Sequence, residues 1–333
     1  MKKYCILAIL CCFSYLAAAQ TPVEKGLESI NRASAEAYIG FLAHDELQGR
    51  EEAGSHGSRV AAQYIASLLQ AMGVQPLGDN YFQPFEAYRR ERQKKGRLEV
   101  HPDSIALFSK EVHQKLPMTN VLGIIPGKNV NEYAIVGAHF DHLGIDPALD
   151  GDQIYNGADD NASGVSAVLQ IAKAFIASGK QPERNIIFAF WDGEEKGLLG
   201  SKFFVQTCPF ISQVKGYLNF DMIGRNNKPQ QPMHVVYFYT EANAAFGKWL
   251  KEDIKKYNLR LEPDYRPWDN PIGGSDNGSF AKAGVPIIWY HTDGHPDYHQ
   301  PSDHADRLNW EKIVEITRAS FLNAWNLANE KEY

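Results

Sequence analysis

From residue 133 onward, the sequence alternates short apolar runs with longer segments of helical periodicity. The apolar runs are rich in β-branched and aromatic residues and predict buried strands at 133–139, 185–191, 216–223, 234–240 and 285–290. Apolar residues at helical spacing predict helices at 162–178, 194–206, 241–257 and 310–328. This alternation predicts an α/β fold in which a mixed, mostly parallel central sheet carries helices on both faces.

The segment before residue 133 carries weaker signals. Residues 57–74 have apolar positions at helical spacing and end near a glycine, so they predict a helix. Residues 81–103 are polar, aromatic and basic, and predict a solvated strand pair rather than a nucleic-acid surface. Because no Pro/Gly/Ser-rich linker divides the chain, residues 20–333 are expected to form a single domain.

The first 19 residues have the pattern of a secretory signal peptide. Lys2 and Lys3 precede an apolar run at 5–16, which is too short to span a bilayer as a mature helix, and small residues at 17–19 form a cleavage site. The sequence therefore predicts an exported protein, periplasmic or secreted, without stable membrane insertion after signal removal. Only Cys208 would remain, so no intramolecular disulfide is expected, which suits a bacterial envelope.

Composition excludes several classes of function. With 44% hydrophobic and 22% charged residues the chain can build a real core, which argues against disorder. A net charge of −6 provides no bulk attraction for nucleic acid or anionic lipid. Oligomeric state is left open by the sequence.

Four of the expected strands, at 133–139, 185–191, 216–223 and 285–290, contain or are followed by carboxylates or imidazoles. Since ligands of α/β sheets bind beyond the carboxyl ends of the strands, these side chains are expected to meet at one edge. Gathering so many acids without a counter-charge would cost several kcal/mol, and a divalent cation removes that cost. Two histidines with three carboxylates suit zinc or a similar metal, and a pair of ions ~3.5–4 Å apart is a known hydrolytic arrangement.

The motifs that carry these residues resemble those of a known family. They are HFD at 139–141, GADDNASG at 157–164, DGEE at 192–195, NFDMIG at 219–224 and YHQPSD at 298–303. In this order and spacing they are similar to the motifs of the zinc aminopeptidases that share a superfamily with glutamate carboxypeptidase and glutaminyl cyclase. The resemblance runs from about Leu42 to near the C-terminus.

The resemblance implies a role for each matching residue. Asp160 would bridge two zinc ions, Glu195 and His299 would complete one site, and His139 and Asp221 would complete the other. Glu194 would act as general base toward a metal-activated water, Asp141 would orient His139, and Tyr298 would stabilise the oxyanion. The implied activity is removal of N-terminal residues from peptides.

Neighbouring polar residues are given plainer interpretations. Asp159 is expected to shape its loop, and Asp192 to cap the following helix. Additional histidines on loops are usually solvated, so none of these four is expected to bind metal: His142, His291, His295 and His304. Trp289 lies in an apolar run and is expected in the core, although a pocket position is also possible.

Two other functions stay open. A glutaminyl cyclase with one zinc would use the same Asp, Glu-Glu pair and last His. The peptidase is favoured because the GADDNASG and YHQPSD segments are peptidase-like and because KGLLGS follows Glu195 without the longer insertion of cyclases. A non-catalytic binding domain of the same fold should have lost a ligand or the base, and none is missing.

Overall fold

The computed structural model describes residues 20–52, 54–90, 98–243, 245–268 and 273–330, so the expected signal peptide lies outside the described residues. A mixed nine-stranded sheet crosses the molecule in the order β1-β3-β5-β4-β6-β9-β7-β8, with β2 paired to β3. The strands are β1 (Gln75–Pro76), β2 (Phe82–Arg90), β3 (His113–Ile125), β4 (Asn129–His139), β5 (Arg184–Trp191), β6 (Val214–Phe220), β7 (His234–Tyr239), β8 (Glu262–Pro267) and β9 (Ile287–His291).

The centre of the sheet is parallel, as the alternating pattern predicts. β4 pairs in parallel with both β5 and β6, and β6 pairs in parallel with β9. Antiparallel pairing is found farther out, between β3 and β5 and between β7 and β9. The carboxyl ends of β4, β5, β6 and β9 therefore meet at one edge of the sheet.

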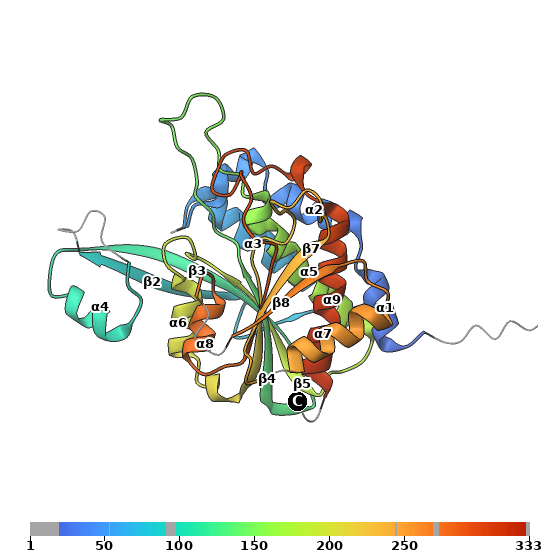
Figure 1. Ribbon diagram of the computed structural model, residues 1–333. Helices are drawn as coiled ribbons and strands as arrows, with labels where there is room; N and C mark the ends of the chain where they lie inside the picture. Colours follow the sequence, from blue (N-terminus) through green and yellow to red (C-terminus); the bar gives the residue numbers. More distant parts are fainter. Residues whose placement is uncertain (1–19, 53, 91–97, 244, 269–272, 331–333) are drawn as a thin grey trace, which may run out of the picture.

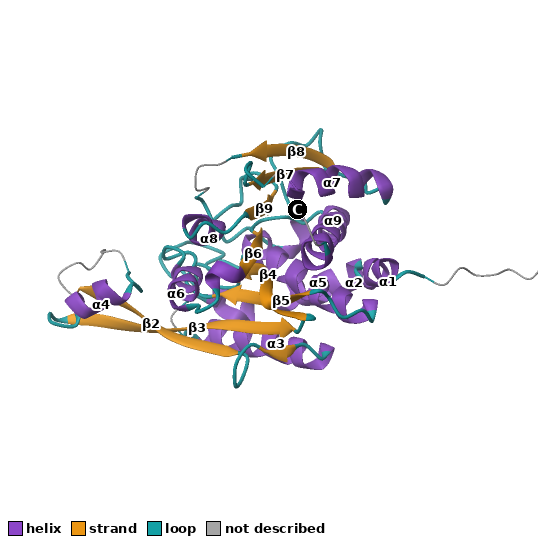
Figure 2. Cartoon of the chain, turned by 90° about the horizontal axis from the view of Figure 1, so that it is seen from below, coloured by secondary structure: helices purple, strands orange, loops and turns teal. Residues whose placement is uncertain are grey.

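Helices cover both faces of the sheet (Figure 2). The helices are α1 (Pro22–Ser29), α2 (Arg32–Leu42), α3 (His56–Met72), α4 (Pro102–Phe108), α5 (Gly164–Ser178), α6 (Leu199–Thr207), α7 (Ala245–Lys256), α8 (Asn277–Lys282) and α9 (Trp310–Asn329). Shorter helical turns are η1 (Asp45–Arg50), η2 (Ala158–Ser163), η3 (Ile211–Gln213) and η4 (Ala305–Arg307). The layered α/β architecture predicted from the sequence is confirmed.

Strand alternation divides the interior into two apolar layers. Along β5, Ile186, Phe188 and Phe190 join the core that the sheet forms with α3, α5 and α9. Ile187, Ala189 and Trp191 point the other way, into the layer beneath α6 and α8. Every residue of β5 is buried, which explains why its sequence is a continuous apolar run rather than an alternating one.

One local expectation is wrong, and another is confirmed only in part. The helix expected from residue 194 begins only at Leu199, because residues 194–198 form a tight turn in which Leu198 has a φ of 62°. The strand pair expected within 81–103 is present only as one antiparallel bridge between Tyr88 and Glu99. Along its length β2 pairs instead with β3, with Phe82 opposite Val121 and Arg90 opposite His113. Phe85 and Ala87 of β2 are buried, so this strand is not simply solvated.

Together β2 and β3 extend beyond the body of the molecule and carry α4 at their far end (Figure 1). Phe85, Met118 and Leu199 form part of a small separate core where this arm meets α6. Among the described residues, no helix combines the length and the apolar composition that crossing a bilayer requires.

Candidate metal centre

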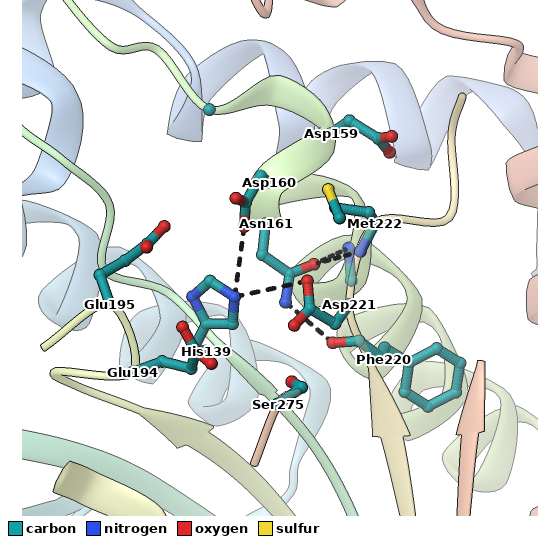
Figure 3. Close-up of polar contacts among 12 residues, drawn as sticks. His139, Asp159, Asp160, Asn161, Glu194, Glu195, Phe220, Asp221, Met222 and Ser275 are labelled. Carbon is teal, nitrogen blue, oxygen red and sulfur yellow. Dashed lines mark hydrogen bonds and ion pairs between the residues drawn. The ribbon is translucent and has the colours of Figure 1, made fainter. Parts of the chain in front are cut away.

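The ends of β4, β5 and β6 bring four chemically active side chains together. His139 is the last residue of β4, Glu194 and Glu195 follow β5 by a short turn, and Asp221 follows β6 directly. Asp160 lies in η2, the helical turn that directly precedes α5. Figure 3 shows His139 between Asp160 and Asp221, with the two glutamates close by.

The His139 ring is oriented with one nitrogen toward these acids. Nδ1 lies 3.2 Å from the main-chain oxygen of Asp141. Because a carbonyl oxygen only accepts, Nδ1 carries a proton, which leaves Nε2 as the nitrogen available to a metal ion. Nε2 is buried and makes no hydrogen bond within the described residues, yet it lies 3.3 Å from Oδ1 of Asp160 and 3.6 Å from Oδ1 of Asp221.

A second imidazole faces the other side of Asp160. Nε2 of His299 lies 3.2 Å from Oδ2 of Asp160 and 3.1 Å from Oε2 of Glu195. Ligands of one tetrahedral zinc ion, bound at 2.0–2.1 Å, lie about 3.3 Å apart. His139, Asp160 and Asp221 form a first donor set, and His299, Asp160 and Glu195 form a second. In each set the imidazole nitrogen lies 3.1 to 3.6 Å from the two carboxylate oxygens, close to this spacing, and Asp160 offers one oxygen to each set. The residues therefore fit two adjacent divalent metal ions.

Burial and the attraction of nearby carboxylates act in opposite directions on the protonation of His139 and His299 when no metal is bound. Burial lowers the pKa of His299, but Asp160 and Glu195 outweigh it and raise the pKa to about 10. Burial also lowers the pKa of His139. The carboxylates of Glu194, Asp160 and Asp221 outweigh this effect and hold that pKa well above its usual range. A bound metal displaces these protons, so metal affinity falls as the pH is lowered.

The pKa values of Glu194 and Glu195 are shifted in opposite directions. For Glu195, burial is outweighed by His142 and His299, which lower the pKa. Burial raises the pKa of Glu194 well above its usual range; His139 opposes this shift, and the Asp221 and Asp276 carboxylates add to it. Glu194 also lines a cavity of about 280 Å³ together with Asp160, Asp221 and His299. A carboxylate with a raised pKa beside the donor atoms is placed to accept a proton and release it again.

Asp141 holds the turn that carries both glutamates. Its Oδ1 accepts a hydrogen bond from the Glu194 N–H at 3.1 Å, and its Oδ2 accepts one from the Glu195 N–H at 3.2 Å. The carboxylate stays 3.7 Å from Nδ1 of His139, whose hydrogen bond goes to the main-chain oxygen of Asp141 instead. Asp141 thus orients His139 through its backbone and the glutamates through its side chain.

Tyr298 lies at the mouth of the same cavity. Its side chain is 43% exposed, and its ring stacks on His299 with centroids 3.8 Å apart. Burial raises the pKa of the Tyr298 hydroxyl, and the surrounding carboxylates raise it further, so the phenol keeps its proton at neutral pH. The hydroxyl can therefore serve as a hydrogen-bond donor.

Asp303 ends the YHQPSD segment, but its role could not be predicted from the sequence. The Asp303 carboxylate accepts hydrogen bonds from the N–H groups of Asp159 at 2.9 Å and Asp160 at 3.0 Å. It thereby fixes the turn from which Asp160 projects. Asp159 shapes the same turn, as expected, by accepting from the Gly224 N–H at 2.6 Å.

Several interpretations of single residues need correction. His142, His291 and His295 are buried, not solvated as loop histidines usually are. His304 does remain partly exposed and lies 2.9 Å from Asp152. Asp192 does not cap α6; its Oδ2 accepts from the Thr119 N–H at 2.9 Å on β3, because the helix starts too far along the chain.

Trp289 is at once a core and a cavity residue. It is 9% exposed, stacks on Phe238 with centroids 5.1 Å apart, and lines the same cavity as Glu194. Met222 and Trp289 both line the cavity, so it has apolar as well as charged lining residues.

Comparison with known proteins assigns this architecture to a family. The family model described as peptidase family M28 matches residues 120–323, which is more than half of the chain. The chain belongs to peptidase family M28. The match includes every residue of the two donor sets.

Individual relatives with curated names match only part of this M28 chain, at about a third sequence identity. Leupeptin-inactivating enzyme 1 of Streptomyces exfoliatus is 32% identical over 170 residues, covering 50% of this chain and 34% of the relative. Leucine aminopeptidase 2 of Trichophyton rubrum is 33% identical over 199 residues, covering 57% of this chain and 36% of the relative. The chain thus spans about a third of the length of these curated relatives.

Solved structures share the fold of this M28 chain. The LapA aminopeptidase of Legionella pneumophila superposes with a TM-score of 0.69 at 23% identity, covering 100% of this chain and 80% of that one. BSAP, a zinc aminopeptidase from Bacillus subtilis, gives a TM-score of 0.69 at 14% identity, covering 91% and 97%. At these identities the likeness establishes the fold alone.

Outside the region matched by the M28 model, Arg50 supports the metal centre from behind. Its guanidinium is 1% exposed and donates to the main-chain oxygens of Phe140 at 2.9 Å, Asn156 at 2.6 Å and Gly157 at 3.1 Å, and also to that of Leu42. Burial lowers its pKa to about 10, against the raising effect of nearby carboxylates. The group stays protonated at neutral pH and partly offsets the acids of the site.

We expect Arg50→Met to lower the free energy of unfolding by about 3 kcal/mol or more, because it strips donors from several buried carbonyl oxygens. Denaturant unfolding of the metal-free protein measures this change. Arg50→Lys, which keeps the charge and up to three donors, should lose less. An unfolding midpoint that does not move in Arg50→Met would show that these hydrogen bonds contribute no net stability.

Proposed function

We propose that this M28 chain is a zinc-dependent aminopeptidase that holds two zinc ions. The observation that carries the proposal is the division of the Asp160 carboxylate between two imidazoles, with Oδ1 toward His139 and Oδ2 toward His299. Asp221 would complete the first zinc site and Glu195 the second. The leucine aminopeptidases among its relatives and the zinc aminopeptidases that share its fold support the same activity.

The bound ions would supply Lewis-acid polarisation of the scissile carbonyl and lower the pKa of water at the site. The protein's own groups do the rest. The Glu194 carboxylate takes a proton from the attacking water and delivers it to the nitrogen of the leaving amine. The Tyr298 hydroxyl donates a hydrogen bond toward the oxygen on which negative charge develops.

The substrate we propose is the N-terminal residue of a peptide. A cavity of about 280 Å³ is small for a pocket, which supports recognition of one residue at a time. Met222 and Trp289 in its lining favour an apolar side chain at that residue. We further propose that residues 20–333 act as a single exported domain after removal of residues 1–19 as a signal peptide.

The test is hydrolysis by purified protein of leucine p-nitroanilide and of its N-acetylated form. We expect cleavage of the free-amine substrate alone, loss of activity on dialysis against a chelator, and its return with zinc at two ions per chain. Zinc content is measured by atomic emission. Ring closure of N-terminal glutamine with one bound zinc would identify a cyclase instead, and bound zinc with neither reaction would indicate a binding domain.

A further inference from the structure

His142 contacts Glu195 of the proposed metal site but belongs to neither donor set. The side chain is fully buried at the start of the loop that follows β4. Its Nδ1 lies 2.8 Å from Oε1 of Glu195, and its ring centroid lies 5.9 Å from that of His299. His142, Asp160 and Glu195 can also be grouped as three donors close enough to hold an ion.

The spacing of the atoms distinguishes a ligand from a supporting residue. Nδ1 of His142 is 2.8 Å from Glu195 but 4.0 Å from Asp160, whereas Nε2 of His299 is 3.1 and 3.2 Å from the same two residues. Donors to one tetrahedral zinc lie about 3.3 Å apart, so His299 fits this spacing with both acids. His142 instead has the short contact of a single hydrogen bond.

The two oxygens of Glu195 are thereby divided between two histidines. Oε2 faces His299 and the donor atoms of that set, and Oε1 faces His142. An ionised carboxylate only accepts, so the hydrogen on Nδ1 of His142 is donated to Oε1. This bond leaves Oε2 as the oxygen free for a metal.

The surroundings of His142 are built to keep the ring in this position. A Cβ atom at position 157 would lie 2.6 Å from the ring carbon Cδ2, so Gly157 leaves the space that the imidazole occupies. Gly157 also has a φ of 58°, a conformation that favours glycine. On the other side, the main-chain N–H of His142 donates to the Arg50 oxygen at 3.1 Å.

We infer that His142 is a positioning residue that fixes Glu195 as a single-oxygen zinc ligand by donating a hydrogen bond from Nδ1. The inference rests on the proposed metal centre, but it concerns metal binding and not the reaction that follows. Partners of this kind commonly change metal affinity 10–100-fold when they are removed.

The experiment compares zinc affinity in His142→Ala and His142→Asn by competition with a chromogenic chelator. Asn places an N–H near the position of Nδ1, whereas Ala removes the donor. We expect one of the two zinc ions to bind His142→Ala about 10–100-fold more weakly, with stoichiometry restored at saturating zinc. His142→Asn should recover most of the lost affinity. His304→Ala, at the exposed histidine near Asp152, is the matched control and should bind zinc normally.

Three outcomes would overturn the inference. Equal affinity in the wild type and both variants would show that Oε1 of Glu195 needs no donor. Equal loss in Ala and Asn, with one ion missing even at saturating zinc, would make His142 a ligand. Loss in Ala that tracks a lower melting temperature of the metal-free protein, without rescue by Asn, would make its role purely structural. A wild type that binds no zinc would instead refute the proposed function.

Discussion

Glu194→Gln is expected to lower kcat by a factor of about 10² to 10⁴ while the protein keeps its full complement of metal. The amide of glutamine has nearly the shape of the carboxylate but cannot take a proton from water. Glu194 belongs to neither donor set, so its replacement leaves the metal ligands in place. Steady-state kinetics with leucine p-nitroanilide and metal analysis of the same sample measure both quantities.

A matched control is available on the surface. Glu252, an exposed residue of α7, undergoes the same chemical change in Glu252→Gln and should leave kcat as it is. If Glu194→Gln retained full turnover, another group would have to accept the proton. If it lost metal instead, Glu194 would have to be regarded as a ligand.

Asp160→Ala is expected to loosen both metal positions at once and to abolish measurable turnover. Each donor set loses one oxygen, and the two proposed zinc ions would lose the carboxylate between them. The loss of affinity should exceed the roughly 10–100-fold effect of removing a hydrogen bond to a ligand. Zinc titration with a chelator as competitor follows the two binding events.

Asp221→Ala is the informative comparison, because Asp221 contacts the set of His139 and not that of His299. It should weaken one position and spare the other. Unchanged stoichiometry in Asp160→Ala, or an identical loss in both variants, would remove Asp160 from the bridging position.

The members of the two donor sets could be predicted because each is tied to a local signal. His139 and Asp221 stand where buried strands end, and the geometry of a parallel sheet brings such ends together. The groups that support them could not be predicted in this way. Arg50 and Phe140 are 90 residues apart in sequence, and Asp303 and Asp160 are 143 apart. No periodicity or short motif encodes contacts over such separations.

The same limit explains the errors on His142 and Asp192. A histidine after a strand is usually solvated, and only the close approach of Gly157 and Glu195 shows that this one is enclosed. An aspartate before a helical pattern commonly caps it, but the left-handed turn at Leu198 delays the helix and frees Asp192 to bond with β3. Both outcomes depend on tertiary contacts that override the local preference.

The contacts of Arg50 show that the stable folded unit extends beyond the stretch that the family model matches. The stretch matched by the family model, 120–323, omits α1, α2, α3 and η1, yet α3 packs on β3 and η1 provides the guanidinium that donates to main-chain oxygens next to the donor residues. A recombinant fragment trimmed to that stretch would present bare apolar strand faces and unpaired carbonyl oxygens at its centre. The minimal stable unit therefore reaches back at least to η1, and a sequence survey that crops to the shared stretch discards residues that support the donor sets.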